Sequence, residues 1–256
     1  MISSTSNAQI KRLLQLQKKG KVRKAEGVFI VEGIRMFAEV PKDQVEKLYI
    51  SENLLKKYPA LSLESYPVEV LSEQVFAAVS DTKTPQGILC VVQQREYQLQ
   101  ELLNEKNPYL MVLDNIQDPG NLGTIMRTAE GAGATGIIMS RDCVDVYNPK
   151  TIRSTMGSIY RVPFVYVEQI SKMFPLLKKK GIKTYAAHLD GKHTYDKEDY
   201  TKGTAFIIGN EGNGLRADIT EQADVKVRIP MHGEVESLNA AIAASILMFE
   251  VCRQRR

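Results

Sequence analysis

The stretch that decides the fold is the apolar run Tyr109-Leu110-Met111-Val112-Leu113 and the turn that follows it, Asp118-Pro119-Gly120-Asn121-Leu122-Gly123, with Arg127 just beyond. Two comparable turns come later: Ile208-Gly209-Asn210-Glu211-Gly212-Asn213-Gly214, and Ile229-Pro230-Met231 leading to Ser237-Leu238-Asn239. Each turn follows a predicted strand. Because α/β sheets build small-molecule sites at the carboxyl ends of parallel strands, the ordered set predicts a cofactor-binding enzyme domain.

Apolar runs alternate with helical patterns from this stretch to the C-terminus. Near-continuous apolar strands suit a parallel sheet that is covered on both faces. The fold class is therefore predicted to be α/β, with a parallel α/β domain at residues 108–256. We expect its strands at 110–113, 136–139, 164–167, 183–187, 205–208 and 225–229, and its helices at 121–132, 149–157, 169–180, 215–222 and 237–252.

Residues 1–95 are predicted to form a smaller α/β module. An amphipathic helix is expected at 5–19, because apolar residues recur there at helical spacing. Strands are expected at 28–31, 45–50, 68–71 and 88–92, with short helices ending at Val40 and near 52–57 and 72–79. The polar residues 96–107 that follow are predicted to be a linker or a linking helix between the two domains.

The bulk composition is that of a soluble globular protein. The 256 residues are 43% hydrophobic and 25% charged, and no apolar run approaches a membrane span. The first residues lack the apolar stretch of a secretory signal. Three scattered cysteines favour reduced thiols, so we expect a cytoplasmic protein that does not associate with membranes.

Basic residues gather at both ends of the chain, although the net charge is only +4. Clustered cations are typical of a polyanion partner, because each neutralised phosphate releases counterions. A solvated helix face with a frayed tail accounts for the same charge equally well. The candidate RNA-binding residues are Lys11, Arg12, Lys18, Lys19, Arg23 and Lys24, and the C-terminus adds Arg253, Arg255 and Arg256.

The first turn has the pattern of a capped helix beside an anion site. Asn121 is a good N-cap residue, and Arg127 lies opposite the apolar stripe. A helix N-terminus favours anions, and an arginine nearby adds a forked donor for phosphate. A plain capped helix with a solvated arginine remains the alternative. The stripe that should pack on the sheet consists of Leu122, Ile125, Met126 and Ala129.

The second and third turns add polar groups to the same region. Glu211 lies in a glycine-rich loop, where it can accept hydrogen bonds from a ligand or orient an arginine; a simple turn is the alternative. Ser237 is placed to cap the last helix, and Asn239 serves either a ligand or that cap. Small residues along this helix favour a helix–helix or subunit interface: Ala240, Ala241, Ala243, Ala244 and Ser245.

Other familiar sites have little support in the sequence. The glycine cluster follows a late strand, which is a poor match to the dinucleotide fingerprint after the first strand. His188, His193 and His232 form no metal-binding pattern, so no metal is expected. There is also no Walker motif and no nucleophile elbow.

Taken together, the three turns resemble the three motifs of the SPOUT methyltransferases. The pattern is most similar to the SpoU (TrmH) branch, which methylates ribose 2′-hydroxyls of ribosomal or transfer RNA, and the resemblance covers residues 108–252. The segment Phe29-Ile30-Val31-Glu32-Gly33 resembles the RNA substrate-binding domain that precedes SpoU domains.

The resemblance implies a deep trefoil knot, S-adenosyl-L-methionine as cofactor and a homodimer formed through the knotted domain. The implied catalytic residues are Arg127, Asn121, Glu211, Ser237 and Asn239. The implied cofactor-binding residues are Gly209, Ile229, Leu238, Met231 and, after another strand, Leu189.

A mechanism follows as a hypothesis. Arg127 would anchor the target phosphate and stabilise the developing alkoxide, with Glu211 and Asn121 holding its guanidinium. The favoured substrate is 23S ribosomal RNA. Transfer RNA is the alternative, and so is a non-catalytic role as an RNA-binding ribosome assembly factor. An oxidoreductase is disfavoured by the missing early glycine fingerprint.

Overall fold

The computed structural model describes all 256 residues and divides into two compact units. The first unit consists of Met1–Arg95 and Asp145–Tyr160, and the second of Glu96–Val144 and Arg161–Arg256. None of the helices has the length and apolar character needed to cross a membrane.

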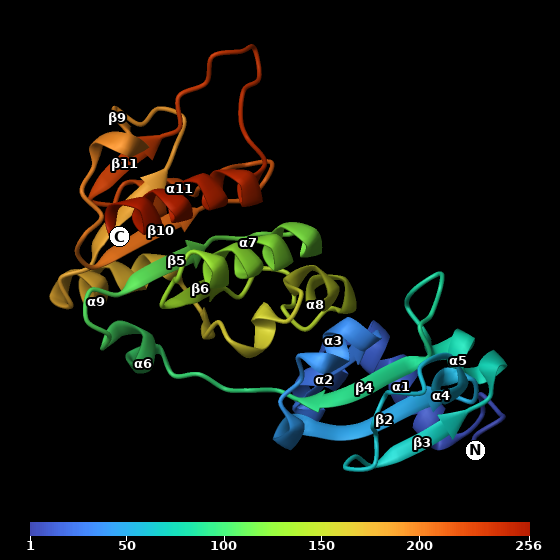
Figure 1. Cartoon of the computed structure of the whole chain (residues 1–256). Coiled ribbons are helices and arrows are strands. Elements are labelled where there is room, and N and C mark those ends of the chain that lie inside the picture. The colour runs from blue at the N-terminus through green and yellow to red at the C-terminus, as the bar shows by residue number, and fades with distance from the viewer. The chain divides into compact units, whose positions relative to one another are not determined.

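A four-stranded sheet forms the centre of the first unit (Figure 1). Its order is β1-β4-β2-β3, with β4 antiparallel to both neighbours and β3 parallel to β2. The strands are β1 (Val28–Glu32), β2 (Val45–Ser51), β3 (Val68–Leu71) and β4 (Ile88–Gln93). The helices are α1 (Ala8–Lys18), α2 (Gly20–Glu26), α3 (Ile34–Ala38), α4 (Leu54–Lys57), α5 (Glu73–Val79) and α8 (Pro149–Thr155). The sequence patterns predicted all of these except α2.

The amphipathic pattern of α1 places its apolar stripe in the core of the first unit. Ile10, Leu13 and Leu16 are fully buried, and they share one cluster with Val75 and Phe76 of α5. The helix begins at Ala8 because the Asn7 side chain accepts a hydrogen bond from the Gln9 amide.

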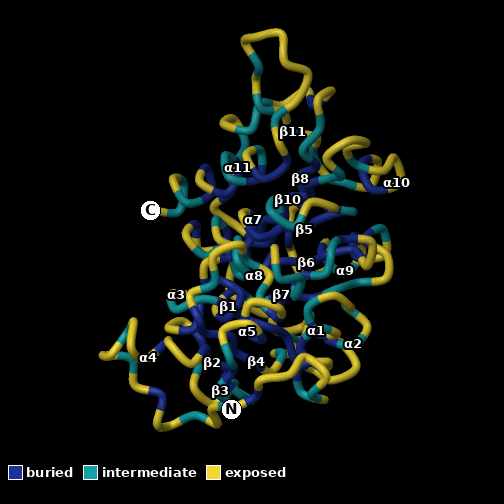
Figure 2. The backbone as a smooth tube through the Cα atoms, turned by 90° about the vertical axis from the view of Figure 1, so that its right-hand side faces the viewer, coloured by how far each residue is buried: buried dark blue, intermediate teal, exposed yellow.

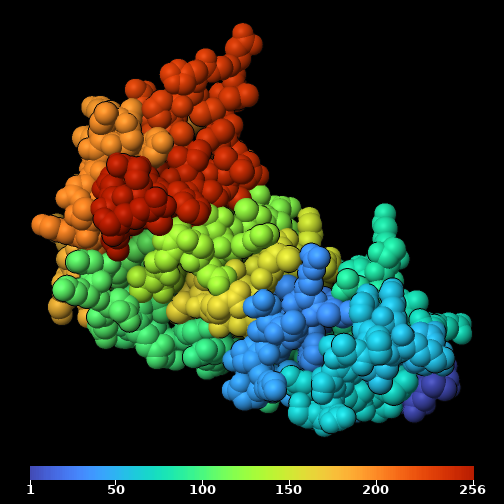
Figure 3. All heavy atoms as spheres, in the orientation of Figure 1, coloured from blue at the N-terminus to red at the C-terminus, as the bar shows by residue number.

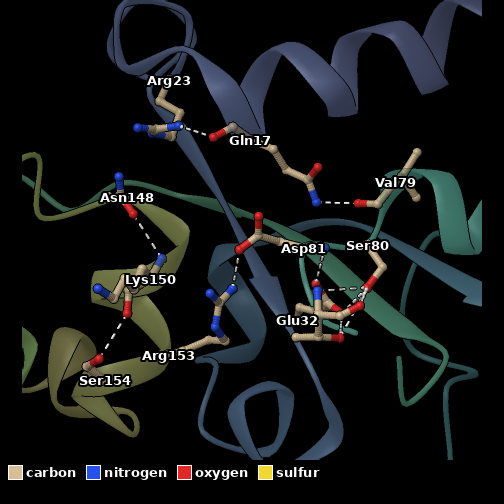
Figure 4. A network of polar contacts seen from close by, with 11 residues as sticks. Gln17, Arg23, Glu32, Val79, Ser80, Asp81, Asn148, Lys150, Arg153 and Ser154 are labelled. Atoms are coloured by element: carbon tan, nitrogen blue, oxygen red, sulfur yellow. Dashed lines mark hydrogen bonds and ion pairs between the residues drawn. The ribbon is translucent and has the colours of Figure 1, made fainter. Parts of the chain in front are cut away.

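The segment Asp145–Tyr160 belongs to the first unit, although its sequence position suggested the second domain. Polar contacts account for this (Figure 4): Arg153 donates to Asp81 at 2.6 Å, and the Asp81 amide donates to the buried Glu32 at 2.9 Å. Farther along, Arg23 pairs with Asp145. Long-range contacts of this kind cannot be read from a local pattern.

A seven-stranded sheet forms the centre of the second unit. Its order is β7-β6-β5-β10-β8-β11-β9, and every neighbouring pair is parallel. The strands are β5 (Tyr109–Leu113), β6 (Gly136–Ser140), β7 (Phe164–Val167), β8 (Lys183–Ala187), β9 (His193–Thr194), β10 (Thr204–Ile208) and β11 (Val225–Arg228). The predicted parallel α/β domain is confirmed, and only the two-residue β9 was not expected.

Helices cover both faces of this sheet, as the apolar strands predicted. The helices are α6 (Leu99–Leu103), α7 (Pro119–Gly131), α9 (Phe174–Lys179), α10 (Ala217–Thr220) and α11 (Ala240–Gln254). One core cluster joins α6, α9 and α10 to the sheet, while α7 and α11 lie side by side over the other face (Figure 1). The predicted linker thus contains α6, whose Leu102 and Leu103 are buried in the core of the second unit.

The C-terminal residues are fixed to the second unit and do not form a frayed basic tail. Arg255 donates to the carbonyl oxygens of Tyr200 and Asn107, at 2.8 Å each. Arg253 pairs with Glu250 one turn before it. Two of the three C-terminal arginines are therefore engaged within the protein, which weakens their predicted part in a polyanion footprint.

Figure 2 shows where burial is concentrated. The central strands β5, β6 and β10 of the second unit are buried along their whole length, whereas the long connection between β11 and α11 is exposed along most of its length. That connection carries the third of the three turns.

Candidate active site

The first turn follows β5 and leads into α7. Asp118 is the N-cap of α7, because its carboxylate accepts a hydrogen bond from the Asn121 amide at 2.8 Å, and Pro119 occupies the first helical position. The predicted N-cap, Asn121, instead lies inside the first turn of the helix. Because Asp118 caps the helix, the Asn121 side chain is available for other contacts. The apolar stripe of α7 is buried as predicted: Leu122, Ile125, Met126 and Ala129.

The Glu211 carboxylate ties the second turn to the first. It accepts hydrogen bonds from the backbone amides of Gln117 and Asp118, at 3.1 Å each, and from the Asn121 side chain at 3.0 Å. Burial acts to raise the pKa of Glu211, but these hydrogen bonds outweigh it and the pKa lies below its ordinary value. Glu211 is therefore a carboxylate at neutral pH.

Asn239 brings the third turn to the same point. Its side-chain amide donates to Asn121 Oδ1 at 2.9 Å, while its own oxygen accepts from the amides of Ala241 and Ile242. Asn239 is thus the N-cap of α11, and the prediction that Ser237 caps this helix is wrong. The result is a continuous chain of hydrogen bonds from Glu211 through Asn121 to Asn239.

The segment Gly209–Leu215, here called the glycine loop, closes on itself. The amide of Asn210 donates to the Gly214 carbonyl at 3.0 Å, and the reverse bond is 2.9 Å. A Cβ atom at Gly209 would lie only 2.3 Å from the Gly214 carbonyl carbon, so the backbone at this position leaves room for glycine alone.

A cavity of about 430 Å³ lies between the glycine loop, the end of β8 and the connection before α11. This volume is within the range of small-molecule sites. All five predicted cofactor-binding residues line it, and so do Glu211 and Ser237 among the predicted catalytic residues. The lining residues that matter here are Leu189, Gly209, Glu211, Ile229, Met231, Ser237 and Leu238.

Arg127 takes no part in the hydrogen bonds that join Glu211, Asn121 and Asn239. It lies on the exposed side of α7 and forms no hydrogen bond or ion pair in the structure. Glu211 and Asn121, which were expected to hold its guanidinium, bind each other and the neighbouring backbone instead. An arginine without an internal partner is available to an external anion.

Sequence reasoning missed one charged pair close to the site. Asp114 is fully buried at the end of β5, and Arg216 grips it with two bonds, from Nε at 3.1 Å and from Nη2 at 2.5 Å. Burial raises the pKa of Asp114 and the guanidinium opposes that rise. The available signal was positional, since Asp114 follows β5 directly and Arg216 follows the glycine loop.

The first unit carries the excess positive charge. It holds 16 Lys and Arg residues against 11 Asp and Glu, whereas the second unit holds 18 against 19. Lysines on α1 and α2 and between them are exposed: Lys11, Lys18, Lys19, Lys21 and Lys24.

Two predicted RNA-binding arginines pair with carboxylates of the first unit. Arg23 is 3% exposed and donates to the Leu16 and Gln17 carbonyls as well as to Asp145, so its assignment to RNA is wrong. Arg12 pairs with Glu26 at 2.6 Å and Glu46 at 2.7 Å, which neutralises its charge locally. The available cations on these helices are therefore lysines.

Comparison with known proteins agrees with this geometry. The model of the SpoU rRNA Methylase family matches residues 108–249, and that of the MRM3-like substrate binding domain matches residues 7–90. The 23S rRNA (guanosine(2553)-2′-O)-methyltransferase RlmP of Bacillus subtilis (strain 168) is 32% identical over 98% of both chains. The 23S rRNA (guanosine-2′-O-)-methyltransferase RlmB of Escherichia coli (strain K12) is 27% identical over 90% of this chain and 99% of its own.

Solved structures extend the similarity to the fold of the whole chain. An AdoMet-bound rRNA methyltransferase from Sinorhizobium meliloti superposes with a TM-score of 0.86 at 30% identity, covering 98% of this chain and 97% of its own. The SpoU methyltransferase AviRb from Streptomyces viridochromogenes, in complex with AdoMet, gives 0.85 at 26% identity, covering 97% and 98%. The family expected from the three turns is confirmed: this chain belongs to the SpoU rRNA methylase family.

Proposed function

We propose that this protein transfers a methyl group from S-adenosyl-L-methionine to a ribose 2′-hydroxyl of 23S ribosomal RNA. The observation that carries the proposal is that the second and third turns line one cavity, while hydrogen bonds from Glu211 through Asn121 to Asn239 tie the first turn to them. Family membership points to the same reaction. Membership of this family also implies the deep trefoil knot expected of the fold.

The cavity fits the cofactor in size and chemistry. Gly209 lines the cavity without a side chain, so a ligand at this point of the wall meets backbone groups. Leu189, Ile229, Met231 and Leu238 supply the apolar part of the lining. When bound, the sulfonium of S-adenosylmethionine supplies an electrophilic methyl group. The chain must then hold the ribose oxygen in line with that methyl, and such alignment contributes up to roughly 7–11 kcal/mol in favourable systems.

The catalytic roles follow from which groups are engaged and which are free. Arg127 is free, and we assign it to the phosphate beside the target ribose and to the developing alkoxide. Glu211 stays ionised and orients Asn121, which in turn positions Asn239. Ser237 lines the cavity and shapes its rim.

The substrate-binding role belongs to the first unit. Its exposed lysines, Lys11, Lys18, Lys19 and Lys24, suit the phosphates of a folded RNA. Ribosomal RNA is preferred to transfer RNA because both curated relatives described above act on 23S rRNA by name. A ribosomal substrate also favours the cytoplasm as the compartment.

We further propose that two copies associate through the second unit. Ile242 and Phe249 are two turns apart on the same side of α11, and they are 50% and 49% exposed. Large apolar side chains exposed in this way are typical of an interface. Sedimentation analysis of the wild type and of Phe249→Lys tests this directly, and a monomeric wild type would contradict it.

The decisive experiment combines a cellular and a purified assay. Ribose methylation is mapped across total RNA from cells with and without this protein, and one 23S position should lose its methyl group. In the purified protein, Arg127→Ala should lower methyl transfer roughly 100-fold or more while S-adenosylhomocysteine still binds. Arg141→Ala is the matched control, since Arg141 is an exposed arginine that pairs with Glu168. A full methylation map in cells without the protein would refute the proposal.

A further inference from the structure

We propose that Asp114 and Arg216 are positioning residues that keep the glycine loop closed against the cofactor, and that they act separately from Glu211. The inference rests on the proposed function, because it takes S-adenosylmethionine as the ligand of the cavity. It concerns residues that do not line the cavity themselves.

The glycine loop is fastened to the turn after β5 at two places. Glu211 accepts hydrogen bonds from the Gln117 and Asp118 amides, in the later part of that turn. Arg216 follows the loop directly, and its guanidinium donates two hydrogen bonds to Asp114, the first residue after β5. A paired fork of this kind fixes orientation as well as distance. Between the two fastenings lie four residues that line the cavity: Gly212, Asn213, Gly214 and Leu215.

The two fastenings reach different groups. Glu211 connects to Asn121 and through it to Asn239, so it belongs to the chain at the edge of the cavity. The Arg216 guanidinium contacts only two carboxylates, that of Asp114 and, at 3.6 Å, that of Asp142. Loosening Arg216 should therefore displace the cavity wall and leave the Glu211–Asn121–Asn239 chain in place. Loosening Glu211 should chiefly disturb that chain of hydrogen bonds.

The pair is also built to resist loosening. Asp114 is fully buried, and a buried carboxylate that loses its only cation is strongly destabilising. The guanidinium of Arg216 is itself half-exposed, so the pair lies at the edge of the core, with its anion inside and its cation outside.

The test compares Arg216→Gln with Glu211→Gln in the full-length protein. S-adenosylhomocysteine binding is measured by calorimetry without RNA, and KM and kcat are measured with ribosomal RNA. Arg216→Gln should weaken S-adenosylhomocysteine binding and raise KM for S-adenosylmethionine by about tenfold, the size of a coupling between contacting groups, with a smaller effect on kcat. Glu211→Gln should chiefly lower kcat. Arg216→Lys should recover only part of the affinity, because an ammonium cannot form the fork.

Two controls keep the outcome interpretable. Arg141→Gln removes a neighbouring exposed arginine that pairs with Glu168, and it should change neither constant. Asp114→Asn avoids the unpaired buried charge if Arg216→Gln folds poorly, and the double variant should lose less affinity than the sum of the single losses. Unchanged cofactor affinity in a folded Arg216→Gln protein overturns the inference alone. A wild-type protein that binds no S-adenosylhomocysteine overturns the proposed function and the inference with it.

Discussion

Two loops of the second unit line the same cavity, yet they are held in very different ways. The glycine loop is fixed by Glu211, by Arg216 and by its own Asn210–Gly214 bonds. The connection Pro230–Leu238, here called the β11–α11 loop, forms no hydrogen bond between those residues and projects from the rest of the second unit in Figure 1 and Figure 3. The cavity wall formed by the glycine loop is therefore fixed by hydrogen bonds, whereas the wall formed by the β11–α11 loop is held only at its ends.

The difference assigns separate tasks to the two loops. Groups that stabilise a transition state must be oriented before the reaction, and the glycine loop with Glu211 meets that condition. A loop that is held only at its ends opens at a low free-energy cost, and a bound ligand can raise that cost by supplying contacts. Met231 and Leu238 of the β11–α11 loop line the cavity, so a bound ligand should contact this loop there.

The largest expected effect is loss of the oriented carboxylate. Glu211→Gln should lower the methyl-transfer rate roughly 100-fold, because it weakens the bonds to the Gln117 and Asp118 amides and releases Asn121. Single-turnover assays with ribosomal RNA measure this. Glu236→Gln in the β11–α11 loop is the matched control, since Glu236 also lines the cavity but forms no bond. Equal losses in the two variants would remove the distinction between the loops.

Hydrogen exchange should separate the loops directly. Amides of the β11–α11 loop should exchange fast without ligand and slow by up to about 100-fold at a ligand concentration 100 times Kd. The amides of Asn210 and Gly214, which are already bonded, should be protected in both states. Mass spectrometry with and without S-adenosylhomocysteine provides the measurement. Slow exchange of both loops in the free protein would show that the cavity is preformed on both sides.

A smaller effect is expected from added side-chain volume in the fixed wall. Gly209→Ala brings a Cβ within 2.4 Å of the Gly214 carbonyl oxygen and the Leu215 nitrogen, so the backbone must move. Overpacking of this kind costs typically 1–3 kcal/mol, and we expect cofactor affinity to fall by about tenfold or more. Gly233→Ala in the β11–α11 loop meets no atom within 4 Å and should bind normally in the same calorimetric titration.

The smallest effect concerns acid. The pKa of Glu211 is lowered in the folded protein, so its contribution to stability is complete above its unfolded pKa of about 4.3 and is lost as the pH falls through the lower folded value. The stability difference between wild type and Glu211→Gln should thus be constant above about pH 5 and shrink in acid. Urea unfolding across a pH series measures it. A difference that grows in acid would mean that the folded carboxyl is protonated more easily than the unfolded one.

Local patterns in the sequence were reliable for elements and for membership of the site. The apolar run of β5, the stripe on α7 and the positions of α1 and α11 all follow from periodicity, which depends on near neighbours. The five predicted cofactor-binding residues, which the resemblance to the SpoU family implied, all line the cavity.

Caps and ion pairs were less predictable. Asn121 and Ser237 both have good capping side chains, yet Asp118 and Asn239 occupy the caps, because two or three residues decide where a helix begins. Among the N-terminal cations, Arg12 and Arg23 could not be distinguished from the lysines by sequence alone. Their carboxylate partners Glu46 and Asp145 lie far away in the chain.

By itself, the sequence determined the α/β class, the order of the elements and the three turns that supply the candidate site residues, because strand and helix periods and turn residues act over a few positions. Only the tertiary structure decided which charges are engaged within the fold, that Asn121 joins Glu211 to Asn239, and that Arg216 grips Asp114. These contacts join residues from separate loops, and their partners are set by how the chain packs.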